Sequence, residues 1–108
     1  RLNSIVAPYA VAVLPLFDKP RMMEIARDVV ARVNSVRGCK GWMDSSKSIG
    51  RRYARVDEIG VPWAVTIDHE SIEDGSVTVR RRDDQKQIRC SVNDMIDYLS
   101  KGDIGSLF

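Results

Sequence analysis

Two arginine-rich segments contain the residues best suited to bind a ligand. Residues 47–58 carry four basic side chains against two acidic ones, and residues 76–90 carry five against two. The whole chain has a net charge of only +2, so its overall charge says little about nucleic acid. Arginine gathered in one place is nevertheless what phosphate binding requires. These segments therefore have two interpretations, a phosphate-binding surface or an ordinary solvated face.

Residues that could catalyse a reaction are much sparser. The sequence contains neither a G-x-G-x-x-G nor a G-x-x-x-x-G-K-[ST] phosphate loop. Its one histidine, His69, lies between Asp68 and Glu70, and no motif places a serine or cysteine nucleophile with it. We therefore expect a chain that is not catalytic by itself, with His69 as a surface side chain.

Metal, cofactor and membrane binding are not predicted either. Cys39 and Cys90, with a single histidine, are too few ligands for a four-coordinate zinc site, so we expect two buried, reduced thiols in a cytoplasmic protein. The apolar stretch at residues 5–17 is shorter than the roughly 18 residues that a membrane span needs. Two prolines also interrupt it.

Hydrophobic periodicity predicts an α/β fold that would position the arginine-rich segments. The expected strands are residues 9–16, 39–44, 62–68, 77–82 and 86–90. The expected helices begin near Pro20, Ser48 and Ser91 and end near Gly38, Gly60 and Gly102. Their order predicts a mixed sheet of about five strands flanked by three helices, with residues 69–75 as a polar loop.

The length of 108 residues and the hydrophobic content of 44% predict one compact domain. We place this domain at residues 1–102. Residues 103–108 are then a C-terminal tail, which is expected to fray unless Leu107 and Phe108 dock. Because the first residue is Arg rather than Met, we expect the chain to be a piece of a longer protein.

Side-chain alternation along the last two strands predicts a polar face. If apolar residues pair with apolar ones across the hairpin, Arg80, Arg82, Gln87 and Arg89 share the opposite face. On the second helix, residues 51, 55 and 58 follow helical spacing and form a stripe directed to solvent or to a ligand.

Several motifs, the two longest of which overlap the arginine-rich segments, resemble glycyl-tRNA synthetase anticodon-binding domains. Residues 44–62 are similar to the family's acidic-serine stretch followed by S-I-G-R-R-Y-x-R-x-D-E-I-G, and residues 65–68 to its T-x-D strand ending. Residues 79–89 are similar to the R-D-R-D-x-x-x-Q-I-R hairpin, and residues 5–16 are a weaker match to the opening. Two residues depart from the pattern: Lys47 stands where a small residue is usual, and Arg81 where an acidic one is.

The resemblance implies a class IIa anticodon-binding fold that binds the anticodon loop of a glycine tRNA. Glycine anticodons have cytosine at their second and third positions, and cytosine presents an amino donor that a carboxylate can accept. The side chains expected to read bases are Arg80, Arg82, Asp83, Gln87 and Glu58. Those expected to contact phosphates are Lys47, Arg51, Arg52, Arg55 and Arg89.

The parent enzyme implied by the resemblance is a cytoplasmic glycine–tRNA ligase that uses ATP and Mg²⁺ in a separate catalytic domain. Such enzymes are commonly homodimers through that domain, which leaves the present piece free to be monomeric. The near alternatives are the anticodon-binding domains of threonyl-, prolyl- and histidyl-tRNA synthetases, which share the fold. A synthetase-like accessory module that binds protein is the alternative of another class, and a small nucleotide-binding enzyme is a distant third.

Overall fold

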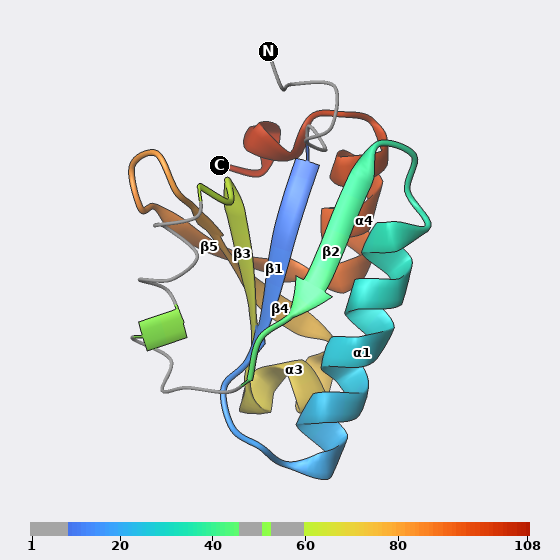
Figure 1. Cartoon of the computed structure of the whole chain (residues 1–108), viewed down its shortest axis with the longest axis vertical. Helices are drawn as coiled ribbons and strands as arrows, with labels where there is room; N and C mark the ends of the chain where they lie inside the picture. The colour runs from blue at the N-terminus through green and yellow to red at the C-terminus, as the bar shows by residue number, and fades with distance from the viewer. Residues whose placement is uncertain (1–8, 46–50, 53–59) are drawn as a thin grey trace.

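A five-stranded mixed sheet forms the centre of the protein in the computed structural model, which describes residues 9–45, 51–52 and 60–108 (Figure 1). The strands are β1 (Tyr9–Pro15), β2 (Cys39–Met43), β3 (Trp63–Ile67), β4 (Ser76–Arg81) and β5 (Gln87–Ser91). In space their order is β2-β1-β3-β4-β5, with β1 parallel to both of its neighbours and β4 antiparallel to β3 and β5. The mixed sheet predicted from the sequence is confirmed.

Two longer helices cover one side of this sheet. The first, α1 (Pro20–Asn34), has proline in its first turn, where the missing N–H does no harm. The second, α4 (Val92–Ser100), begins where the Ser91 hydroxyl accepts the Asp94 N–H at 3.0 Å, so the predicted cap is confirmed. Of the helix expected to begin at Ser48, the structure describes residues 51 and 52, and both are helical.

The polar loop expected at residues 69–75 is wrong, because a short helix, α3 (His69–Asp74), forms there. The Asp68 carboxylate accepts the Ser71 N–H at 3.1 Å, and the Ser71 hydroxyl accepts the Asp68 N–H at 3.0 Å. Gly75 ends the helix at a φ of 73°, a left-handed conformation that favours glycine. This reciprocal cap stabilises a helix whose composition is almost entirely polar.

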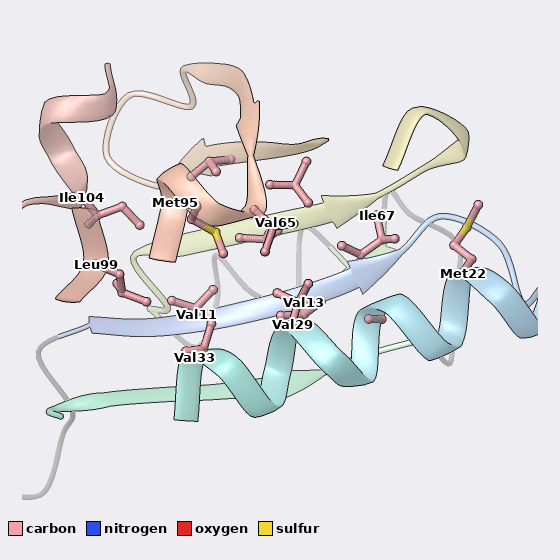
Figure 2. Close-up of a cluster of buried hydrophobic side chains, with 14 residues drawn as sticks. Val11, Val13, Met22, Val29, Val33, Val65, Ile67, Met95, Leu99 and Ile104 are labelled. Atoms are coloured by element: carbon pink, nitrogen blue, oxygen red, sulfur yellow. The ribbon is translucent and has the colours of Figure 1, made fainter. Parts of the chain in front are cut away.

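The main hydrophobic core lies between the sheet and the helices α1 and α4 (Figure 2). Alternate residues of three strands point into it, and all of them are fully buried. These strand residues are Val11, Val13, Val65, Ile67, Val77 and Val79. The helices contribute Met22, Ala26, Val29, Val33, Met95 and Leu99. A smaller cluster of Ala12, Leu14, Val61 and Ala64 lies on the other face, so β1 is buried on both sides.

The last residues pack onto the core instead of fraying. Residues Ile104–Leu107 form a 3-10 helix, η2, and Ile104 is buried in the main core. The Phe108 ring lies 5.8 Å from the Trp63 ring. Leu107 and Phe108 therefore dock on the core. The boundary between the domain and the tail at residue 102 stays a prediction.

Both cysteines are free and half-buried. Burial raises the pKa of each thiol above its ordinary value, which keeps the thiols protonated and weakly reactive at neutral pH.

Candidate nucleic-acid interface

Three of the four residues predicted to share the polar face of the hairpin, Arg80, Gln87 and Arg89, lie on one side of β4 and β5, whereas the fourth, Arg82, lies in the turn because β4 ends at Arg81. Across β4 and β5, Arg80 pairs with Gln87 and Thr78 with Arg89. Thr78 in turn pairs with Thr66 of β3. Because Val77 and Val79 point into the core, alternation directs these neighbours to the opposite side of the sheet. This surface, formed by Thr78, Arg80, Gln87 and Arg89, is called the polar face below.

Within the polar face, residues that the sequence analysis assigned the same role differ in how exposed they are. Arg80 is only 7% exposed, whereas its partner Gln87 is exposed. A guanidinium that reads a base edge must reach the surface. The structure therefore favours Gln87 over Arg80 as a residue that touches RNA directly.

Arg89 is held by four side chains of the protein itself. Its guanidinium donates to Ser76 Oγ and, at 3.2 Å, to Thr78 Oγ1, and it forms an ion pair with Asp68. A second carboxylate, from Glu70, lies 3.6 Å from Arg89 Nε. Burial acts to raise the pKa of Asp68, but hydrogen bonds from the Ser71 backbone and from Arg89 outweigh it and lower that pKa. Arg89 therefore ties β5 to β4 and to the start of α3.

Arg52 is also directed inward. It is 3% exposed, and Nη1 donates to the carbonyl oxygens of Pro15 and, at 2.9 Å, of Asp44. Nη2 reaches the carbonyl of Leu16 at 3.4 Å. Pro15 is the last residue of β1, and Leu16 and Asp44 directly follow β1 and β2, so one side chain connects the carboxyl ends of two parallel strands. A phosphate contact by Arg52 is not favoured by this placement, whereas the preceding Arg51 is exposed.

The remaining predicted residues that the structure describes, Arg82 and Asp83, lie in the turn directly after β4. Trp63, the first residue of β3, pairs with Arg81, so the turn at residues 82–86 lies at the amino end of β3. Arg82 and Asp83 are exposed in this turn, and the Arg82 N–H donates to the Pro62 carbonyl at 2.9 Å. Arg89 pairs with Thr78, three residues before Arg81 on β4, so it lies about 10 Å along the sheet from the start of this turn. The predicted site is therefore an extended strip and not a compact cluster.

Arg81, the departure from the family pattern, points away from the polar face. Its guanidinium forms two bonds to Asp84, with Nε–Oδ1 at 3.0 Å and Nη2–Oδ2 at 2.7 Å. It also lies 4.5 Å from the centre of the Phe108 ring. Arg81 therefore holds the turn and is not part of the polar face.

Phe17 is an exposed aromatic residue that the sequence analysis did not single out. It is 49% exposed, and its ring lies 5.7 Å from the ring of His69 at a tilt of 40°. Lys19 Nζ is 5.7 Å from the Phe17 ring centre. An exposed aromatic pair beside a cation can stack on an unpaired base. Phe17 follows a buried apolar strand directly, so nothing local in the sequence marks it as exposed.

Three predicted contact residues lie outside the described residues, namely Lys47, Arg55 and Glu58. Their roles stay predictions.

On the helical side of the sheet, an open groove of about 340 Å³ lies between α1, α3 and the start of α4. Charges of both signs line it, including Arg21, Asp28, Arg32 and Asp74. Arg32 donates to the Asn93 side chain at 2.8 Å across it. Mixed charge makes this groove a poorer phosphate surface than the polar face. In the described part of the chain, no helix has the length and apolar character needed to cross a membrane.

Comparison with protein families gives one match that covers most of the chain. The family described as "Anticodon binding domain" matches residues 10–102. A glycine–tRNA ligase of Methanothermobacter thermautotrophicus is 48% identical over 94% of this chain, and one of Borrelia hermsii is 42% identical over 92%. This chain spans about a fifth of each relative's length, 18% and 22%.

Solved structures of similar fold have a lower sequence identity to this chain than the relatives above. A prolyl-tRNA synthetase from Cryptosporidium parvum superposes with a TM-score of 0.78 at 21% identity, over 88% of this chain and 20% of that one. The RNA binding domain of threonyl-tRNA synthetase from the same organism gives 0.74 at 18% identity, over 90% of this chain and 24% of that one. At this identity the similarity establishes the fold alone.

The neighbouring arginines 51 and 52 provide a matched pair of variants. We expect Arg52→Ala to lower the free energy of unfolding by about 1–3 kcal/mol, because it leaves buried carbonyl oxygens without their donor. Arg51→Ala should change it by less than about 0.5 kcal/mol, as is usual for an exposed side chain. Urea denaturation measures both. Equal losses in the two variants would contradict the structural role given to Arg52.

The pair formed by Arg81 and Asp84 predicts a pH effect. The hydrogen bond from Arg81 lowers the pKa of Asp84 to about 2. Because the pKa is lower in the folded state, the ionised carboxylate stabilises the fold above about pH 4, and this contribution is lost as the pH falls toward 2. A carboxyl ¹³C titration should find the low midpoint, and Arg81→Gln should raise it. A midpoint unchanged by that substitution would show that the pair does not form in solution.

Proposed function

This chain belongs to the anticodon binding domain family, and from that premise we propose that it binds the anticodon loop of a glycine tRNA as one domain of a glycine–tRNA ligase. The observation that carries the proposal is the 48% identity to a glycine–tRNA ligase over 94% of the chain. The prolyl and threonyl structures, at 21% and 18% identity, support the fold of the domain.

We assign the RNA contacts to the exposed members of the predicted set. Asp83 can accept the amino group of a cytosine, while Arg82 and Gln87 offer donors to its ring nitrogen and carbonyl oxygen. Arg51 is suited to a phosphate contact. Arg52, Arg80 and Arg89 act indirectly, because burial or intramolecular bonds commit their guanidinium groups.

Phe17 adds a stacking surface to this proposal. Unpaired bases in RNA loops are commonly held on aromatic rings, with basic side chains near the backbone. Phe17 follows Leu16, whose carbonyl binds Arg52, so the ring lies at the same end of the sheet as the helical residues 51 and 52.

Aminoacylation belongs to the rest of the parent protein. In this proposal a separate catalytic domain binds ATP and Mg²⁺ and charges the acceptor end of the tRNA, in the cytoplasm and as a homodimer. The present chain binds neither cofactor and supplies recognition only. A synthetase-like accessory module that binds protein is the second candidate, and the mixed-charge groove between α1 and α4 is the observation that favours it.

An NMR titration with a glycine anticodon stem-loop tests the proposal. We expect the largest shift changes at residues 51, 82, 83 and 87, and we expect them to vanish largely when both anticodon cytosines are changed to guanine. Arg82→Ala should weaken binding about tenfold, a typical cost of losing one base contact. The matched control is Arg27→Ala, which removes the same charge from the exposed side of α1.

Equal binding of both loops, or shift changes confined to the groove between α1 and α4, would count against anticodon recognition. The accessory-module alternative would then be preferred.

A further inference from the structure

The turn between β4 and β5 is held by the Asp84 side chain and not by a glycine. Asp84 Oδ1 accepts the Lys86 N–H at 3.1 Å, and both carboxylate oxygens bind Arg81. The Arg81 N–H donates to the Lys86 carbonyl at 2.9 Å. Gln85 has a φ of 61°, a left-handed conformation that is unfavourable for a residue with a side chain. The turn therefore depends on the contacts of Arg81 and Asp84 to keep its shape.

The Phe108 ring packs against the Arg81 guanidinium and restrains its orientation. The ring centre is 4.5 Å from Arg81 Cζ, and it is 5.8 Å from the Trp63 ring at a tilt of 31°. An arginine over an aromatic ring gains both electrostatic attraction and packing. Phe108 thus packs between the first residue of β3 and the arginine that closes the turn.

The backbone before Phe108 is anchored at several points. Ile104 is 1% exposed and belongs to the main core. The Asp103 N–H donates to the Tyr98 carbonyl at 2.9 Å, and the Phe108 N–H to the Gly105 carbonyl at 3.2 Å. Residues 103–108 therefore connect the end of α4 to the turn as an ordered segment.

We propose that Phe108 is a positioning residue for RNA binding, which sets the geometry in which Arg82 and Asp83 meet the anticodon through Arg81. This inference rests on the proposed function. Arg82 and Asp83 are the only residues between the two partners of the Arg81–Asp84 pair, so they move when that pair opens. One further contact of this segment, from the Arg82 N–H to the Pro62 carbonyl, is next to Trp63, which Phe108 also contacts.

The energetic reason is preorganisation. When the turn is already ordered, binding does not pay for fixing the two side chains. Without the Phe108 ring, the guanidinium keeps its carboxylate but loses the surface that restrains its rotation. Affinity then falls because the cost of ordering the turn offsets part of the binding free energy.

The test compares Phe108→Ala with Phe108→Trp and with a control, Leu107→Ala. Leu107 is half-buried against the core one position earlier, so its loss costs packing without touching Arg81. Binding of a fluorescently labelled glycine anticodon stem-loop is measured at a temperature where urea denaturation shows every variant folded. Hydrogen exchange of the amides of residues 82–86 provides a second readout.

We expect Phe108→Ala to weaken binding about tenfold, the scale of ordering one or two side chains. Turn amides should exchange about tenfold faster, in proportion to the opened population. Phe108→Trp should restore both, and Leu107→Ala should bind like the wild type. If Phe108→Ala binds like the wild type while Arg82→Ala is weakened, the positioning role is refuted and the proposed function stands. If the wild-type chain shows no preference for the glycine loop, the proposed function fails and this inference with it.

Discussion

Val77 and Val79 are completely buried on β4, and this burial determines which side chains are left to meet a ligand. Side chains alternate along a strand, so the same register places Thr78 and Arg80 on the other side, opposite Arg89 and Gln87. A slip of one residue would bring an arginine into the valine core and expose the valines. The same strand register is therefore required both to keep the core and to form the polar face. The ends of the strip depend on it too, because the register sets where the turn and Arg89 lie.

The arginines show how one residue type serves different purposes in one small domain. Arg52 is almost fully buried and donates to main-chain carbonyls where two parallel strands end. Arg89 is balanced by Asp68 and Glu70, and Arg81 by Asp84. A buried guanidinium is tolerable only with such partners. Much of the basic charge seen in the sequence therefore holds the scaffold, and the RNA contacts that we propose fall to a smaller exposed set.

The sequence predicted the features that depend on local pattern. The apolar run of β1, the pairing of the hairpin faces and the cap at Ser91 follow from periodicity and short motifs, and the structure confirms them. The helix α3 was missed because its signal is a reciprocal cap between Asp68 and Ser71 within a polar segment. The burial of Arg52 could not be predicted, because its acceptors come from the ends of β1 and β2, far away in the chain. The packing of Phe108 on Arg81 depends in the same way on tertiary contact between distant segments.

The most direct test asks whether RNA binds to the polar face and to its two ends. A glycine anticodon stem-loop with 4-thiouridine in the loop is photo-crosslinked to the protein, and the attached peptides are identified by mass spectrometry. We expect crosslinks to residues 82–89 and to the neighbourhood of Arg51 and Phe17, with few to α1 or α4. Crosslinks concentrated at Arg21, Arg32 and Asn93, around the groove between α1 and α4, would contradict this expectation.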